Sequence, residues 1–309
     1  MFPNINENMK SPMTRREALK RMGAFAALLS LELTGVSALT SCSNKKARRI
    51  IFFFTATGNS LFVAKMLSDE TLSIPQELKK NDLVYEADEI GFVFPDYAAS
   101  APLIVREFIS KAVFKAPYIF SVITYGNFAA NVCEWWDKFA NEQGLHQQYI
   151  KSLMMVDNYL PVFDMNEQIT IDKHTDENLA TIIQEVAAHE EYIEKGDLGR
   201  FSEEGLERLR ASHFPMTAQQ LIDINHDKCI SCGICTRVCP HGNLKLSSEG
   251  VIADGSCEFC LACVHNCTQK ALSLKSRMEG FPGERNPEAR YRHPEISINE
   301  IVRANQQRI

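Results

Sequence analysis

The sequence has no excess of basic residues. Lysine and arginine number 33 against 39 aspartates and glutamates, which gives a net charge of −6 at pH 7. When residues 1–42 are left out, 28 basic residues face 36 acidic ones and the balance is −8. A body this acidic is a poor match for a polyphosphate backbone, so the charge disfavours nucleic acid as a partner.

The composition also lacks the biases of fibrous and disordered chains. Of the 309 residues, 45% are apolar and 23% are charged, which excludes collagen, coiled coil and disorder as the main architecture. A chain of this length is expected to form about two domains. Cysteine is the one unevenly distributed residue, because eight of the ten cysteines lie between Cys229 and Cys267.

The N-terminal segment lacks an apolar run long enough to cross a membrane. The apolar stretch from Met22 to Leu39 is interrupted by Glu32. A membrane-spanning helix needs about 20 predominantly apolar residues, and a carboxylate at its centre would cost roughly 3 kcal/mol. A retained membrane helix is therefore the weaker of two interpretations of residues 1–42.

The stronger interpretation is an export signal. Arg15 and Arg16 precede the apolar stretch, which ends in Leu39-Thr40-Ser41-Cys42. This order resembles a twin-arginine signal that ends in the cleavage box of a bacterial lipoprotein. The resemblance implies that the mature protein starts at a lipidated Cys42, which anchors it to a bacterial membrane on the periplasmic or extracytoplasmic face. Residues 43–49 are then a basic spacer, which contacts anionic headgroups or is simply solvated.

Residues 50–195 alternate continuous apolar runs with helical patterns. The runs resemble strands that are buried on both faces, and they cover residues 50–54, 90–94, 118–124 and 149–156. Strands that alternate with helices predict an α/β domain built on a doubly wound parallel sheet. Ligands of such sheets bind outside the carboxyl ends of the strands.

The loop after the first of these runs is rich in hydroxyl groups. Its sequence is Thr55-Ala56-Thr57-Gly58-Asn59-Ser60, and a helical pattern follows. A helix start offers backbone N–H groups and the positive end of the helix dipole to an anion, which favours a phosphate site. The loop lacks the Gly-Lys-Ser/Thr of nucleoside triphosphate sites and the Gly-x-Gly-x-x-Gly of dinucleotide sites. An ordinary capped turn is the alternative interpretation.

Three further loops at the same end of the sheet each carry a tyrosine, over residues 95–102, 125–127 and 157–161. Together with the first loop they resemble a flavodoxin. The resemblance implies an FMN site. The residues implied to hold the phosphate are Thr55, Thr57, Gly58, Asn59 and Ser60. The residues implied to hold the ring are Tyr97, which stacks on it, and Tyr125, Gly126 and Asn127, which form the second wall. The tyrosines could instead be rim or core residues. Residues 71–84 have only a weak strand pattern, which leaves the strand order at that edge open.

The clustered cysteines form two runs with the same spacing. Cys229-x2-Cys232-x2-Cys235-x3-Cys239 recurs 28 residues later as Cys257-x2-Cys260-x2-Cys263-x3-Cys267. Cysteines three apart on a tight turn can place three thiolates around three corners of an iron–sulfur cubane, and the fourth ligand must come from elsewhere. Zinc sites, which favour two separated pairs, and the disulfide frameworks of small secreted proteins fit this doubled triplet less well.

The doubled run resembles two-cluster bacterial ferredoxins, in which the fourth cysteine of each run ligates the other cluster. The resemblance implies a small α+β domain over residues 221–275 with two [4Fe–4S] clusters. The implied ligands are Cys229, Cys232, Cys235 and Cys267 for one cluster, and Cys257, Cys260, Cys263 and Cys239 for the other. His241 and His265 lie near these ligands and could tune a cluster potential by hydrogen bonding, but a surface position is the stronger expectation.

A charged connector over residues 196–220 and a tail over residues 276–309 complete the chain. Residues 50–309 resemble the flavodoxin–ferredoxin fusion proteins called ferrodoxins, in which a tail similar to Arg290-Tyr291-Arg292 occurs. The resemblance implies a membrane-tethered electron carrier that exchanges electrons between FMN, the two clusters and a redox protein partner, without a catalytic residue of its own. Two alternatives remain, a flavin-dependent reductase of a small oxidant such as a quinone, and a docking module without flavin.

A Cys42→Ala variant tests the export interpretation. Because the acyl chains would be attached to this thiol, the variant precursor is expected to remain uncleaved and to leave the membrane fraction. Gel mobility and membrane partition of the expressed protein measure both effects, with Ser43→Ala as a control that keeps the cleavage box. Unchanged mobility and membrane binding of the Cys42 variant would contradict the prediction.

Overall fold

The computed structural model describes residues 47–213, 216–248, 250–276 and 283–307. The predicted export signal and Cys42 lie outside this part of the chain. Within it, no helix is long and apolar enough to cross a membrane. Residues 47–309 form one compact unit, so the two predicted domains of the body are in contact with each other.

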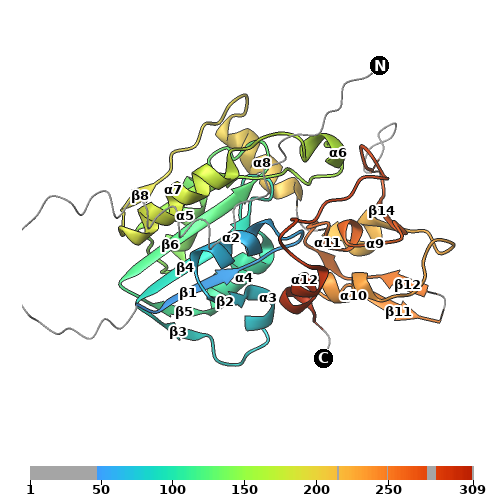
Figure 1. The fold of residues 1–309 in the computed structure, drawn as a ribbon, viewed down its shortest axis with the longest axis horizontal. Coiled ribbons are helices and arrows are strands. Elements are labelled where there is room, and N and C mark those ends of the chain that lie inside the picture. Colours follow the sequence, from blue (N-terminus) through green and yellow to red (C-terminus); the bar gives the residue numbers. More distant parts are fainter. Residues whose placement is uncertain (1–46, 214–215, 249, 277–282, 308–309) are drawn as a thin grey trace, which may run out of the picture. The chain divides into compact units, whose positions relative to one another are not determined.

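A six-stranded parallel sheet forms the centre of the first domain (Figure 1). Its strands follow the order β2 (Glu70–Ser73), β1 (Arg49–Phe53), β4 (Glu89–Pro95), β6 (Tyr118–Tyr125), β7 (Tyr149–Met154) and β8 (Tyr192–Ile193). The four predicted strands are confirmed, since β1, β4, β6 and β7 cover them. The edge that the sequence left open is formed by β2, which pairs with β1.

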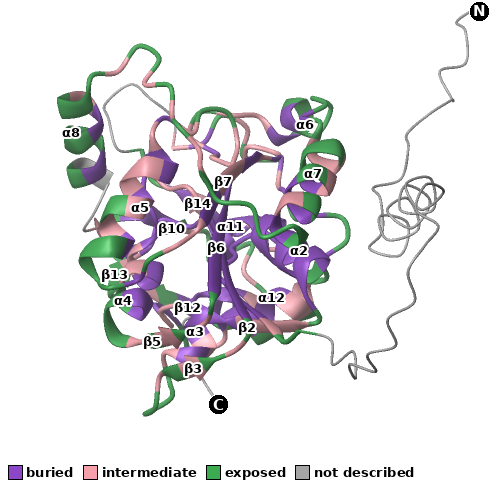
Figure 2. Ribbon diagram, turned by 90° about the vertical axis from the view of Figure 1, so that its left-hand side faces the viewer, coloured by how far each residue is buried: buried purple, intermediate pink, exposed green. Residues whose placement is uncertain are grey.

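Helices cover both faces of this sheet (Figure 2). α4 (Leu103–Lys111) and α5 (Val132–Glu142) lie on one side, and α2 (Asn59–Leu67) and α7 (Thr175–Ala187) lie on the other. Because both faces are covered, β4 and β6 are apolar along most of their length and are buried at every residue except the last. The predicted α/β architecture is therefore confirmed.

The core of the first domain is built largely from aromatic side chains. The indole of Trp136 is fully buried and packs against the Phe94 ring, with 4.7 Å between the ring centroids. Its N–H group donates to Ser121 Oγ at 2.9 Å, which satisfies the only polar group of the indole. A small parallel pair, β3 (Val84–Glu86) and β5 (Val113–Lys115), adds a second layer beside this core.

Two residues of the predicted spacer belong to the first domain. β1 starts at Arg49, whose guanidinium pairs with the buried carboxylate of Glu89. Arg48 pairs with Glu70 at 2.5 Å. Arg49 is therefore part of the sheet, whereas the Arg48 side chain is still 55% exposed beside its carboxylate partner.

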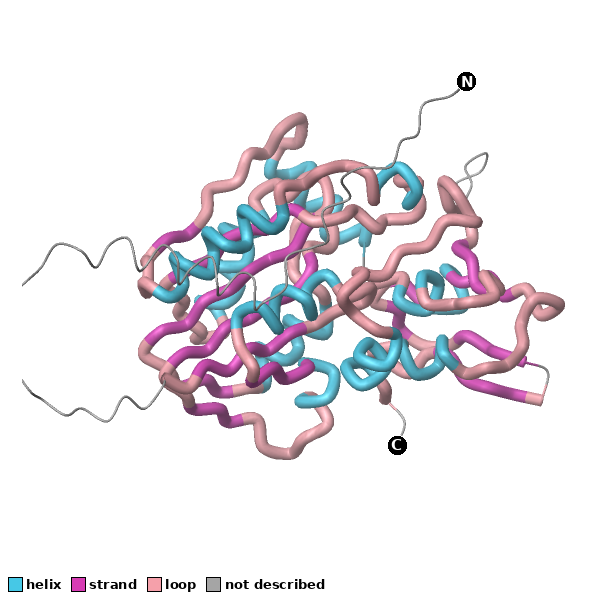
Figure 3. The backbone as a smooth tube through the Cα atoms, viewed as in Figure 1, coloured by secondary structure: helices cyan, strands magenta, loops and turns pink. Residues whose placement is uncertain are grey.

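The second domain repeats one unit of structure with the 28-residue period of its cysteines (Figure 3). The first unit contains β10 (Ile222–Ile224), α10 (Ile234–Val238) and β11 (Leu244–Ser247). The second contains β12 (Gly250–Ala253), α11 (Ala262–His265) and β14 (Leu272–Leu274). The units interlock, because β10 pairs with β14 and β11 pairs with β12, both antiparallel. A short ladder of β9 (Met216–Thr217) with β13 (Ser256–Cys257), and the turn of α9 (Ala218–Leu221), flank them.

The structure contains helices that the sequence did not predict. α8 (Glu203–His213) lies in the connector, the short α6 (Met165–Gln168) precedes α7, and α12 (Ile298–Asn305) lies near the end of the chain. α12 begins with a capping box, in which the Ser297 hydroxyl accepts the Glu300 N–H and the Glu300 carboxylate accepts the Ser297 N–H. α12 contacts α3 (Ile74–Glu77) of the first domain and α10 of the second.

Candidate functional site

The eight clustered cysteines surround two small cavities in the second domain. One cavity is lined by Cys229, Cys232, Cys235 and Cys267. The other is lined by Cys239, Cys257, Cys260 and Cys263. Each set therefore joins the triplet of one run to the fourth cysteine of the other run, which is the grouping that the sequence resemblance implies. Among the described residues, no three such side chains converge on the position of a single metal ion.

The two cysteine loops share an unusual backbone geometry. Ser231 and Gly233 have φ angles of 54° and 71°, and Phe259 and Leu261, each 28 residues later, have φ angles of 54° and 62°. This left-handed region is unfavourable for a side chain such as that of Leu261. The same conformation at equivalent positions of both loops indicates that the cysteine arrangement dictates it, because the residue types differ.

Backbone N–H groups point at sulfur atoms in both repeats. Asn243 N lies 3.3 Å from Cys239 Sγ, and Ala271 N lies 3.2 Å from Cys267 Sγ. Phe259 N lies 3.4 Å from Cys257 Sγ. Hydrogen bonds of this kind favour the thiolate over the thiol, and thiolates are the ligands of iron–sulfur clusters.

Burial has the opposite effect on these thiols. It raises the pKa of Cys235 to about 12 and that of Cys257 to about 11. It also raises the pKa values of Cys260 and Cys263 well above the usual range. Buried thiols that share one cavity become thiolates readily only when a cationic group compensates their charge, which is what a metal cluster does. The chemistry of both donor sets therefore fits a [4Fe–4S] cluster.

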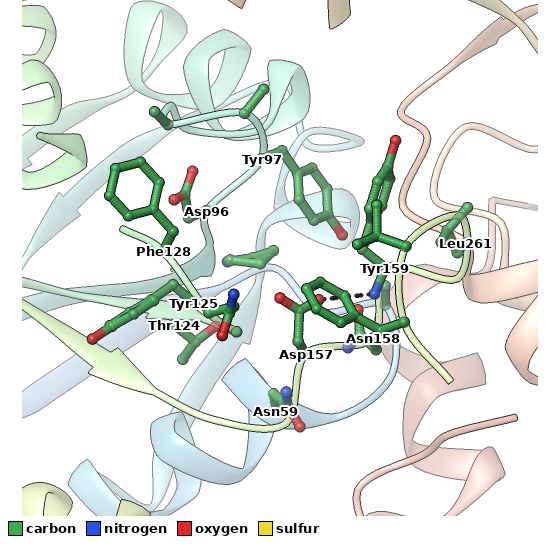
Figure 4. Close-up of a pocket in the computed structure, with 18 of the residues that line it drawn as sticks. Asn59, Asp96, Tyr97, Thr124, Tyr125, Phe128, Asp157, Asn158, Tyr159 and Leu261 are labelled. Carbon is green, nitrogen blue, oxygen red and sulfur yellow. Dashed lines mark hydrogen bonds between the residues drawn. The ribbon is translucent and has the colours of Figure 1, made fainter. Parts of the chain in front are cut away.

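A much larger cavity lies at the carboxyl ends of the strands of the first domain. Its volume is about 740 Å³, which is within the usual range for cofactor sites. The predicted flavin residues that line it are Thr55, Thr57, Asn59, Ser60, Tyr97, Tyr125, Gly126 and Asn127. Figure 4 shows the aromatic side chains of Tyr97, Tyr125, Phe128 and Tyr159 around it. The sequence thus predicted the position of this cavity and most of its polar lining.

The hydroxyl groups of the first loop are already oriented by the protein. Thr55 Oγ1 accepts the Gly58 N–H at 3.1 Å, and Thr57 Oγ1 accepts the Asn158 side-chain amide at 2.7 Å. Because both oxygens act as acceptors, each hydroxyl keeps its hydrogen for donation to an anion. Ser60 Oγ lies 2.8 Å from Thr124 Oγ1. The loop is therefore preorganised as a set of neutral donors at the start of α2.

Gly58 does not line the cavity. It has a φ angle of +107°, and a Cβ atom there would lie 2.9 Å from His293 Cβ and 3.0 Å from Ile296 Cβ. The C-terminal tail, which packs against it, therefore explains why this position is glycine. The same tail fixes the loop, because His293 N donates to Thr57 O at 2.8 Å and the Asn305 side chain donates to Thr55 O at 2.8 Å.

The second cysteine loop forms one wall of the large cavity. Phe259, Cys260 and Leu261 line it from the second domain, opposite the loops of the first. Cys260 thus lines both the large cavity and the cavity of its own cysteine set. No pattern in the sequence indicated that these two sites would meet.

The carboxylate of Glu258 fastens this loop to the first domain. The side chain is 1% exposed and accepts the N–H groups of Leu103 at 2.5 Å and Ile104 at 3.3 Å, the first residues of α4. Pro102, the residue that precedes α4, has no side-chain group to cap the helix itself. Glu258 also lies 2.7 Å from His241 Nε2. A residue between two predicted cluster ligands therefore caps a helix of the other domain.

His265 is a second link between the domains, and its expected surface position is wrong. The side chain is 5% exposed, its Nε2 lies 2.8 Å from Asn158 O, and its Nδ1 accepts the Tyr291 N–H at 3.0 Å. Burial lowers the pKa of His265 to about 4, so the ring is neutral and Nε2 carries the hydrogen. Tyr291 OH in turn donates to Asn59 Oδ1 at 2.7 Å. The role of the Arg-Tyr-Arg tail is thus to join α11 to the first loop.

The connector contributes a wall of the cavity that sequence reasoning missed. Phe201, Leu206 and Leu209 line the cavity from in and around α8. Leu206 is fully buried against Ala99 and Ala130. The available signal was the apolar spacing of Leu206 and Leu209 within an otherwise charged segment, which indicates one apolar helix face.

Comparison with protein families identifies residues 222–245 as a 4Fe-4S binding domain. The matched segment holds β10, the first cysteine run, all of α10 and the first half of β11. No curated protein matches the chain. The chain therefore contains a ferredoxin-type domain, with at least one [4Fe–4S] cluster supported by the match, and iron–sulfur electron transfer is the activity that this domain indicates.

A Glu258→Ala substitution tests the contact between the domains. The change removes the acceptor of two N–H groups at the start of α4, and each unsatisfied buried group costs about 1–3 kcal/mol. We expect the thermal midpoint of the cluster-loaded protein to fall by at least about 4 °C. Glu258→Gln keeps one acceptor oxygen, so its thermal midpoint is expected to fall by less. The control is Glu107→Ala on the same helix, which removes only an exposed pair with Lys111. Equal midpoints for the Glu258→Ala and Glu107→Ala variants would show that the cap contributes nothing.

Proposed function

We propose that the protein transfers electrons between FMN in the large cavity and two [4Fe–4S] clusters held by the two cysteine sets. The observation that carries the proposal is the position of Cys260, which lines both the large cavity and one cysteine cavity. FMN exchanges one or two electrons, whereas a cubane exchanges one at a time, so the pair would convert between two-electron and one-electron carriers.

Strand order supports FMN as the occupant of the large cavity. The strands β2, β1, β4, β6 and β7 follow the order of flavodoxin-like sheets, whose ligand lies where the order reverses. That point lies between β1 and β4, and the loops after both strands line the cavity. The neutral donors of residues 55–60 suit a single terminal phosphate, and the aromatic side chains suit a flat ring.

The two cysteine sets differ in their distance from this cavity. The set of Cys239, Cys257, Cys260 and Cys263 shares a wall with it. The other set includes Cys232, which is exposed, beside Ile230, whose side chain is 64% exposed. We therefore assign the first set to the cluster next to the flavin and the second to the cluster that exchanges electrons with a redox protein partner.

The contacts between the domains support a fixed spacing of the cofactors. Glu258, His265 and Tyr291 each bond the second domain or the tail to a loop or helix of the first. Electron tunnelling needs a constant distance between cofactors rather than chemical contact. These residues bind and orient, and the tunnelling of an electron between the cofactors does not itself break a bond of the protein.

We further propose that the electron carrier is tethered to a membrane by Cys42. The order of paired arginines, apolar stretch and Leu-Thr-Ser-Cys supports this tether. A carrier with inserted cofactors suits a twin-arginine route, which exports folded proteins. The Cys42→Ala variant described above tests the tether without testing the cofactors.

Cys239→Ala tests the crossed grouping of the cysteines. The variant should lose the cluster of Cys257, Cys260 and Cys263 and keep the cluster of its own triplet, because Cys239 lines the cavity of the second run. Iron content and EPR of the dithionite-reduced protein measure the loss. The matched variant Cys267→Ala should show the opposite loss. Loss of the cluster that Cys229, Cys232 and Cys235 hold, rather than of the other cluster, in the Cys239 variant would refute the grouping.

Flavin released by acid from the purified protein tests the occupant of the large cavity. We expect FMN on chromatography, and a Tyr97→Ala variant should bind it at least about fivefold more weakly, since an aromatic contact contributes about 1 kcal/mol beyond the buried area. Tyr192→Ala is the control, because this exposed tyrosine lies on β8 and does not line the cavity. Either FAD, or no flavin after reconstitution with excess FMN, would refute the proposal, and the absence of any flavin would favour a docking module.

A further inference from the structure

Two carboxyl groups face the large cavity from the ends of the two strands that flank β6. Asp96 follows β4 and Asp157 follows β7, and both line the cavity (Figure 4). Asp96 Oδ1 accepts the Ser100 N–H at 3.0 Å, and Asp157 Oδ1 accepts the Tyr159 N–H at 3.0 Å. The donors to both side chains are thus backbone amides, which supply hydrogen bonds without supplying a positive charge.

The cation whose charge acts on Asp96 is engaged elsewhere. Arg210 of α8 donates to Ala99 O at 2.9 Å, to Asn131 Oδ1 at 2.5 Å and to Glu207 Oε1 at 2.8 Å. Its guanidinium therefore interacts with Asp96 only at longer range, and it shares its charge with the Glu207 carboxylate. The other groups that face Asp96 are the Asp157 carboxyl and the Cys133 thiol of α5.

The balance of these effects favours a protonated Asp96. Burial is the largest effect and raises the pKa of Asp96 to about 8, while the backbone bonds and Arg210 lower it only in part. Burial also raises the pKa of Asp157, which the charge of Lys173 opposes. Because the pKa of Asp96 lies above neutral pH, the proton is present at pH 7 and is lost as the pH rises through about 8.

The turn that carries Asp96 is held in a fixed and strained form. Ala98 and Ala99 both have a φ angle of 57°, in the left-handed region that disfavours residues with a Cβ atom. Tyr97 N donates to Ser100 O at 2.9 Å, and Arg210 holds Ala99 O from α8. Strained turns of this kind persist where surrounding contacts over-determine them, which is common at functional sites.

An electron that is transferred into this cavity adds a negative charge, which the clusters cannot neutralise. An iron–sulfur cluster delivers an electron without a proton, and an added negative charge in a buried cavity is costly unless it is neutralised. A neutral carboxyl group at the cavity wall is suited to supply the missing proton.

We propose that Asp96 is the proton donor to the flavin of this cavity, so that each electron delivered by the neighbouring cluster is accompanied by a proton. The inference rests on the proposed function. The O–H bond of Asp96 breaks and an N–H bond forms on the flavin ring. The electron comes from the cluster of the Cys239 set, which is oxidised by one electron. The Asp96 carboxylate then recovers a proton from water.

The protonation of Asp96 is measured first in flavin-free, cluster-loaded full-length protein. Infrared titration should show a protonated carboxyl band at pH 7 that disappears with a midpoint near 8. The band should be missing in Asp96→Asn and present in Asp172→Asn, a matched surface change at a side chain that is 80% exposed. This arm needs no bound flavin, so it stands even when the proposed function fails. A wild-type protein without this band at pH 7 would overturn the inference.

The transfer is measured in FMN-loaded protein by stopped-flow reduction of the flavin. The wild-type rate should be constant below about pH 8 and fall about tenfold per pH unit above it, since the donor is then deprotonated. Asp96→Asn should be slower by about 100-fold or more and should lose this pH dependence. Flavin content of the variant is quantified, so that loss of binding is distinguished from loss of proton transfer. A flavin-loaded Asp96→Asn protein with the wild-type rate and pH profile would overturn the inference and leave the proposed function intact.

Discussion

The loop from Cys257 to Cys263 belongs to two sites at once, and the rest of the structure depends on this shared wall. Its thiols line one cysteine cavity, while Phe259, Cys260 and Leu261 close the large cavity of the first domain. A loop in this position must be held against the first domain without a covalent link. The buried Glu258 carboxylate provides that contact at α4, and His265 and Tyr291 provide it at the loops after β7 and β1. A buried polar group that loses its hydrogen-bond partner destabilises the folded protein. The three contacts therefore fix one arrangement of the domains.

Sequence reasoning was most successful where the signal is local. The apolar runs predicted β1, β4, β6 and β7, because strands covered on both faces must be apolar along their length. The hydroxyl-rich loop and the tyrosine loops predicted the lining of the cavity, since parallel strands bring their carboxyl ends to one edge. The cysteine spacing resembles that of two-cluster ferredoxins, and this resemblance implied the crossed grouping that the two small cavities display.

The features that sequence reasoning missed depend on long-range contacts. β2 has the polar sequence Glu-Thr-Leu-Ser and is a strand because β1 offers it an unpaired edge. His265 resembles a surface residue until the tail folds back and its two ring nitrogens acquire backbone partners. The flavodoxin resemblance includes Gly58 among the residues of the FMN site, whereas in the structure His293 and Ile296 pack against it. α8 closes the cavity from a segment whose charge suggested only a connector.

The central claim is that the flavin lies beside the cluster of the Cys239 set. Pulsed EPR of the one-electron-reduced flavin tests it most directly, because a nearby reduced cluster is paramagnetic and accelerates the relaxation of the flavin spin. The account predicts fast relaxation in the fully loaded protein, retained in Cys235→Ser and lost in Cys263→Ser, since Cys263 lines the nearer cavity and Cys235 the farther one. A flavin spin that relaxes as slowly as an isolated flavin in the fully loaded protein would contradict the account, as would fast relaxation that disappears in Cys235→Ser alone.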